Sequence, residues 1–127
     1  MDFNPRRLIG NEYNMTEIQK IKTFLNKYKA TVYQTDRIPL KVLTPIKFGL
    51  FGEIGSLMST SKKYYREGDV YLRYRENVEE EFGDVLWYFF TYCRRLKIDP
   101  VNLIINKLSE YCDLTLSLVI FYPIYLI

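Results

Sequence analysis

Three acidic residues in this 127-residue chain have the types and the spacing of a carboxylate metal site. Glu81 and Asp84 are three positions apart, so on a helix they lie on one face, one turn apart. Glu53 belongs to an earlier stretch, FGEIGSLMSTSKK, and faces that pair if two helices pack antiparallel. Carboxylates gathered in an apolar bundle repel one another and are costly to desolvate, and a shared divalent cation offsets both effects. The alternative is an ordinary acidic helix start at the surface, with Glu53 paired to a single cation.

The residue types limit which metal such a site could hold. The chain has no His, and its two cysteines, Cys93 and Cys112, lie far apart. A zinc site of the usual kind is therefore not expected, and acid–base catalysis by histidine is excluded. Oxygen ligands favour Mg²⁺, Mn²⁺ or Ca²⁺.

The stretch around Glu53 places further polar residues on the same helical stripe. Ser56, Thr60 and Lys63 follow Glu53 at helical spacing, and Ser56 stands where a second acid would share the face. Glycine costs about 1 kcal/mol in a helix interior, so glycines beside the acids indicate close helix approach or room for a ligand. These glycines are Gly52, Gly55 and Gly83.

The elements that must position these residues are helices, because apolar residues recur at helical spacing. The predicted helices cover residues 16–29, 44–65, 76–96 and 100–113. The second and the fourth begin at Thr44-Pro45 and Asp99-Pro100, where a capping residue precedes a proline. Residues 31–43 contain Pro39 and are expected to be irregular. The sequence thus predicts an all-α bundle of four to five helices.

One domain is expected over residues 1–113, followed by an apolar tail over 114–127. The tail is shorter than the roughly 20 residues of a membrane-spanning helix. An interface segment, the start of a truncated element, an abnormal reading frame and a membrane-associated segment all remain open for it. Residues 1–10 are polar and carry Pro5, so no signal peptide is expected. We expect a cytoplasmic protein without membrane association.

The third predicted helix is apolar nearly all the way round, since residues 85–93 read VLWYFFTYC. Such a helix is buried on both sides, and a small four-helix domain can seldom cover it alone. We therefore expect an oligomer in which the second and third helices form both the acidic site and the subunit contact. The net charge of +3 is spread along the chain, so no nucleic-acid partner is expected.

At these residues the chain resembles the all-α nucleoside triphosphate pyrophosphohydrolases, the MazG-like and dimeric dUTPase superfamily. The pattern of that family is ExxE, a spacer and ExxD. Glu53-Ile-Gly-Ser56 and Glu81-Phe-Gly-Asp84 occupy the two halves, with 24 residues between them. The resemblance spans residues 31–108 and includes the words YQTDR, GLFGEIGSLMSTSKK, EEEFGDVLWYFFTYCRRLKID and NLIINKL.

The resemblance implies an Mg²⁺-dependent enzyme, with Mn²⁺ as a substitute, that cleaves nucleoside triphosphates to monophosphates and pyrophosphate. Such an enzyme removes non-canonical or excess nucleotides and forms a homodimer or homotetramer. Glu53, Glu81 and Asp84 would be the catalytic metal ligands, with Ser56 as a weak fourth. The implied substrate-binding residues are Lys62, Lys63, Trp87, Tyr88, Asn106 and Lys107. Core packing is the alternative for the two aromatic residues, and a solvated surface pair is the alternative for Lys62 and Lys63.

The departure from the family pattern is Ser56, which replaces the second glutamate with a neutral and weaker ligand. Three carboxylates could still hold one Mg²⁺, because that ion usually keeps several waters. A second hypothesis therefore stands beside the enzyme. It is a catalytically weakened relative that binds nucleotides or serves as an assembly module.

Overall fold

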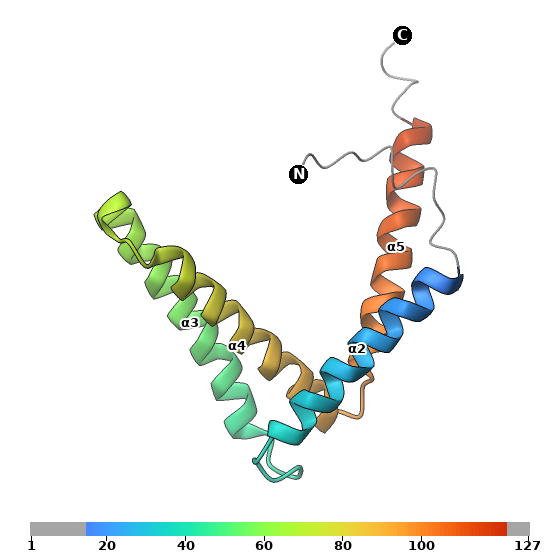
Figure 1. Ribbon diagram of the computed structural model, residues 1–127, viewed down its shortest axis with the longest axis horizontal. Helices are drawn as coiled ribbons and strands as arrows, with labels where there is room; N and C mark the ends of the chain where they lie inside the picture. The colour runs from blue at the N-terminus through green and yellow to red at the C-terminus, as the bar shows by residue number, and fades with distance from the viewer. Residues whose placement is uncertain (1–14, 122–127) are drawn as a thin grey trace. The chain divides into compact units, whose positions relative to one another are not determined.

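The computed structural model describes residues 15–121, with side chains over 16–111, and all regular structure in that range is helical (Figure 1). In chain order the elements are α2 (Met15–Thr35), α3 (Thr44–Glu67), the short 3₁₀ helix η1 (Gly68–Val70), α4 (Tyr74–Arg95) and α5 (Pro100–Phe121). The all-α prediction is confirmed. The chain divides into two compact units, Ala30–Ile98 and Met1–Lys29 with Asp99–Ile127, and each is described by itself.

The central feature of the first unit is an antiparallel hairpin of α3 and α4 (Figure 1). Gly68 ends α3 with a positive φ of 59°, a conformation that favours glycine, and its N–H donates to the carbonyl of Tyr64. At the same end, the rings of Tyr64 and Tyr74 stack with centroids 4.1 Å apart. Tyr74 is the first residue of α4, so the helix begins two residues before the predicted Glu76. The stack gives this early start a packing partner.

Two boundaries at the other end of the hairpin differ from the prediction. Helix α2 continues to Thr35, because nothing before Asp36 interrupts the backbone ladder and the Asp36 N–H still donates to the Val32 carbonyl. The irregular segment is therefore shorter than the predicted 31–43. Leu43, not Thr44, is the N-cap of α3, and it makes no side-chain cap. Thr44 and Pro45 are the first helical residues, which suits proline because it has no N–H to satisfy.

Helix α5 begins as predicted and ends later. The Asp99 carboxylate accepts the Val101 N–H at 3.0 Å, which is the expected N-cap bond. The helix runs to Phe121, eight residues past the predicted end at 113. Residues 114–121 contain neither Pro nor Gly, so nothing stops the helix, while the rest of the tail lies outside the described residues. No helix within 15–121 combines the length and apolar character needed to cross a bilayer.

A buried ion pair fixes the segment between α2 and α3 to the end of α4. The side chains of Asp36 and Arg95 are 0% and 2% exposed, and both guanidinium N–H₂ groups bind the carboxylate, at 2.8 and 3.1 Å. Arg95 also donates to the carbonyls of Ile38 at 2.8 Å, Val42 at 3.0 Å and Thr91 at 3.2 Å. One guanidinium therefore holds three points of the connecting segment.

The surroundings of Asp36 act on its pKa in opposite directions. Burial raises the pKa, whereas hydrogen bonds from Arg95 and the Ile38 N–H and the charges of Arg95 and Arg94 lower it, and the net pKa lies below its ordinary value. The carboxylate therefore stabilises the folded chain at pH values above the ordinary carboxyl pKa. That contribution is lost as the pH falls through the lowered pKa.

Asp36→Asn leaves the Arg95 charge buried without its counter-charge, and we expect it to lower the free energy of unfolding by about 3–5 kcal/mol. Urea unfolding at pH 7 measures this change. Glu79→Gln is the matched control, because Glu79 pairs with Arg75 on the exposed surface of α4 at 65% and 88% exposure. Such a pair contributes less than about 0.5 kcal/mol. Equal losses for the two variants would contradict the stabilising role of Asp36.

Candidate metal site

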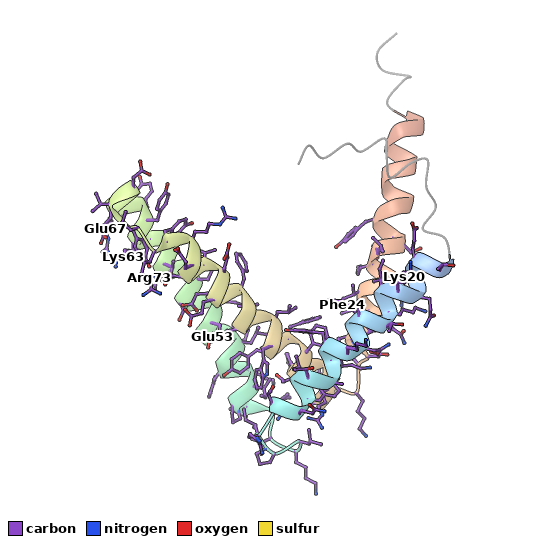
Figure 2. The ribbon with its side chains drawn as sticks, in the orientation of Figure 1. Lys20, Phe24, Glu53, Lys63, Glu67 and Arg73 are labelled. Atoms are coloured by element: carbon purple, nitrogen blue, oxygen red, sulfur yellow. The ribbon has the colours of Figure 1, made fainter. Side chains whose placement is uncertain are left out.

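Three carboxylates converge between α3 and α4 near the middle of the hairpin. One oxygen each from Glu53, Glu81 and Asp84 lies within 4.8 Å of the others (Figure 2 labels Glu53). Glu53 and Glu81 are half-buried, and Asp84 is exposed. The cluster is therefore shielded on one side and open to solvent on the other.

The packing of the hairpin explains why these acids meet. On one side of the cluster the Tyr88 ring lies directly over Gly49, and on the other side Tyr64 stacks on Tyr74. These two contacts fix an antiparallel register in which one turn forward along α3 matches one turn back along α4. Glu53 is one turn beyond Gly49, so it reaches the level of the acids that precede Tyr88.

The electrostatics of the cluster favour a cation. The pKa of Glu53 is raised by desolvation, then by a hydrogen bond with Glu81 and by the negative charges of Asp84 and Glu81. Among the described residues none of these carboxylates forms an ion pair with a lysine or an arginine. The single-salt-bridge alternative for Glu53 therefore finds no partner in this part of the chain. All ligand atoms are hard oxygens, a donor set that fits Mg²⁺ or Mn²⁺.

The residues beside the acids in the sequence are one polar residue, Ser56, and three glycines. Ser56 is half-buried one turn beyond Glu53, and the register of the hairpin places it level with Glu81. A Cβ added at Gly52, Gly55 or Gly83 would meet nothing within 4 Å. These glycines therefore do not mark close approach of α3 to α4.

The lysines implied as phosphate ligands lie away from the carboxylates. Figure 2 shows Lys63 toward the Glu67 end of α3, apart from Glu53. The two residues are ten positions apart, which corresponds to about 15 Å along the helix axis. The Lys63 ammonium lies 4.3 Å from the ring centroid of Tyr71, and Lys62 is exposed next to it.

The aromatic pair on α4 is engaged in packing. The indole N–H of Trp87 donates to the Thr35 hydroxyl at 2.8 Å, and its ring meets Tyr88 edge-on with centroids 5.0 Å apart. Trp87 therefore joins the end of α2 to α4, which favours its structural role. Tyr88 is one turn from Asp84 and remains level with the edge of the cluster.

The implied residues of α5 belong to the second unit of the chain. Asn106 and Lys107 are exposed, and Lys107 forms an ion pair with Glu110 at 2.6 Å. Their role stays a prediction from the resemblance.

The second unit also contains an open pocket of about 590 Å³ along one face of α2, where Figure 2 labels Lys20 and Phe24. The lining residues described are Thr16, Gln19, Lys20, Thr23, Phe24 and Lys27. These lining residues include two lysines and no acid, so the charge of the pocket is opposite to that of the carboxylate cluster.

Sequence reasoning missed Gly49, the tightly packed glycine of the hairpin. A signal was present, because Gly49 precedes Glu53 by four positions and so shares its face. Gly52 and Gly55 stand closer to the acid in the chain, and the sequence alone does not separate them from Gly49. Only the position of the Tyr88 ring distinguishes them.

The comparisons with known proteins find no similar protein. The chain matches no protein-family model, and searches of curated proteins and of solved structures return no match.

Glu53→Gln tests the charge repulsion in the cluster. Because the folded chain holds the Glu53 proton more tightly than the unfolded chain, stability falls as the pH rises through the raised pKa. With EDTA at pH 7.5, we expect the variant to be more stable by roughly 0.2–0.5 kcal/mol, the usual size of a like-charge term. Thermal or urea unfolding across pH 4–8 measures this difference, which should vanish at the acid end. A less stable variant at pH 7.5 would contradict the repulsion.

Proposed function

We propose that this protein is an Mg²⁺-dependent nucleoside triphosphate pyrophosphohydrolase that cleaves (d)NTPs to (d)NMPs and pyrophosphate. The supporting observation is the set of three carboxylates, drawn from two antiparallel helices and lying within 4.8 Å of one another without a compensating cation among the described residues. Carboxylates facing one another across helices are a common way to build metal sites in helical bundles. The order and spacing of the acids agree with the pyrophosphohydrolase resemblance, which favours nucleotide house-cleaning as the role.

The roles of the residues follow from their positions in the cluster. Glu53, Glu81 and Asp84 would hold Mg²⁺, which when bound would neutralise charge on the triphosphate and make a bound water more acidic. Ser56, level with Glu81, offers one hydroxyl to the same region.

Phosphate binding by Lys63 requires its side chain to leave the Tyr71 ring. A cation–π contact at an exposed site is worth only about 0.5–1 kcal/mol, so a bound triphosphate could compete with it. For Lys62, Asn106 and Lys107 a place in the substrate site is implied by the resemblance alone, and Tyr88 lies one turn from Asp84. These assignments rest on the resemblance.

A specific observation supports the second candidate, a weakened relative that binds nucleotides or acts as an assembly module. Ser56 occupies the cluster level at which a fourth carboxylate would face Glu81. A neutral hydroxyl adds no charge to attract a second ion, so metal binding and turnover would both be reduced.

Asp84→Ala removes one metal ligand and tests the enzyme. Loss of a residue that merely supports a ligand costs about 10–100-fold, so loss of the ligand itself should cost at least about 100-fold in pyrophosphate release. The assay follows pyrophosphate release from a panel of NTPs and dNTPs with Mg²⁺ or Mn²⁺. Glu79→Gln, an exposed acid on the same helix, is the control and should retain full activity.

The same assay separates the two candidate functions. Turnover by the wild-type chain that Asp84→Ala abolishes supports the enzyme. Wild-type turnover no greater than that of Asp84→Ala contradicts it, and activity gained by Ser56→Glu would then identify a weakened relative.

We further propose that the chain forms a homo-oligomer through α3. The residues Phe48, Phe51, Gly55 and Met58, here called the α3 stripe, alternate in spacing between three and four positions, which is the heptad pattern of a helix seam. Phe48, Phe51 and Met58 are 72%, 69% and 65% exposed. A second copy of α3 across a two-fold axis would bury the same stripe on both chains.

Phe51→Glu places a charge at the centre of the α3 stripe. We expect it to raise the dimer dissociation constant by at least about 30-fold, the factor for a 2 kcal/mol hot spot. Sedimentation velocity over a concentration series measures this shift. Arg75→Glu is the control, because it adds a carboxylate to a position of α4 that is 88% exposed and lies outside the stripe. A wild-type chain that sediments as a monomer at high micromolar concentration would refute the proposed contact.

A further inference from the structure

We propose that Gly49 is a positioning residue for the metal site, because it admits the Tyr88 ring between α3 and α4 and so sets the spacing of the carboxylates. The inference rests on the proposed function. A Cβ added at Gly49 would overlap the Cε1 and Cζ atoms of Tyr88 and lie 2.7 Å from its hydroxyl oxygen. Real Cβ atoms essentially never come this close to ring atoms. The phenol ring therefore occupies space that exists only because residue 49 has no side chain.

The Tyr88 ring also packs against its neighbour Trp87. Trp87 meets it edge-on at a centroid distance of 5.0 Å and an interplanar angle of 87°. The Trp87 N–H donates to the Thr35 hydroxyl, which itself donates to the Val32 carbonyl, each at 2.8 Å. The end of α2 thus holds the indole against which the phenol packs.

The held ring lies one turn from the carboxylates on both helices. Gly49 precedes Glu53 by four residues on α3, and Tyr88 follows Asp84 by four residues on α4, which is about 6 Å along each axis. A helix segment this short moves nearly as a rigid body. Any change in the α3–α4 distance at the ring is therefore passed to the acids.

The distance between α3 and α4 is important because a bound metal ion needs its ligands at fixed distances. Mg²⁺ takes its ligands at about 2.0–2.1 Å in near-ideal octahedral geometry. Carboxylates on two separate helices can meet that demand only over a narrow range of helix separations. A ring that keeps the two helices at one distance is therefore a determinant of metal affinity.

The chain provides its own control positions. Gly52 and Gly55 lie on the same helix, on either side of Glu53, and an added Cβ at either position would meet nothing within 4 Å. Gly→Ala at these positions changes helix propensity as it does at Gly49, by about 1 kcal/mol in favour of the helix. Only Gly49→Ala also creates an overlap.

The test measures Mn²⁺ binding to the full chain by electron paramagnetic resonance, together with the emission of Trp87, the single tryptophan. We expect Gly49→Ala to weaken Mn²⁺ binding at least 10-fold and to shift Trp87 emission, because the displaced phenol leaves the indole edge. Gly52→Ala and Gly55→Ala should change affinity less than twofold and leave the emission unchanged. Circular dichroism confirms that each variant keeps its helices.

Removal of the ring separates positioning from general packing. Tyr88→Val should itself weaken Mn²⁺ binding, and in the Tyr88→Val background Gly49→Ala should cost less than twofold, because the overlap no longer exists. If Gly49→Ala does not fold, Tyr88→Val decides alone, and unchanged affinity in that variant overturns the inference.

The remaining outcomes distinguish this inference from the proposed function. A wild-type chain that does not bind Mn²⁺ overturns the metal site itself, and with it this inference. A wild-type chain that binds Mn²⁺ while folded Gly49→Ala binds equally well overturns the positioning role alone.

Discussion

The packing of α3 against α4 brings one oxygen each of three carboxyl groups within 4.8 Å of one another, and the hairpin has to accommodate that constraint. Without a counter-charge the arrangement destabilises the hairpin, as the raised pKa of Glu53 indicates. The hairpin must therefore be held together by contacts that do not involve the acids. The Tyr64–Tyr74 stack and the ring of Tyr88 supply such contacts on the two sides of the cluster.

The sequence of helix α3 has to meet a second requirement besides carrying Glu53. Its face toward α4 carries Glu53 and Ser56, while the α3 stripe carries large apolar side chains that the single chain leaves exposed. Exposed apolar patches of this kind mark association sites in soluble proteins. Helix α3 thus serves a proposed metal site and a proposed subunit contact on different faces.

The sequence was sufficient for the helices and for the grouping of the acids, because both depend on periodicity along the chain. It failed at the ends of the helices. The late end of α2 depends on backbone bonds up to Asp36, and the early start of α4 brings Tyr74 onto Tyr64. Helix α5 ends later than predicted, because an apolar composition does not by itself end a helix.

At the site, local spacing could be predicted from the sequence, but contacts between residues distant in the chain could not. The spacing of Glu81 and Asp84 places them on one face whatever the rest of the chain does. The engagement of Lys63 by Tyr71 and of Trp87 by Thr35 depends on side chains that no local pattern links. Phosphate-binding roles could therefore be suggested from the sequence only by resemblance, whereas the carboxylate grouping could be argued from geometry.

The hydrogen bonds of Arg95 limit where residues can be inserted into this chain. Connecting segments that carry proline and lie at the surface usually tolerate insertions. Here a single guanidinium binds the Asp36 carboxylate, the Ile38 carbonyl and the Val42 carbonyl. These hydrogen bonds hold the segment between α2 and α3 at three points and so fix its length. An added residue would pull at least one acceptor away from a buried arginine. The turn at η1 carries no such anchor to Arg95, and it is where extra residues could be accommodated between α3 and α4.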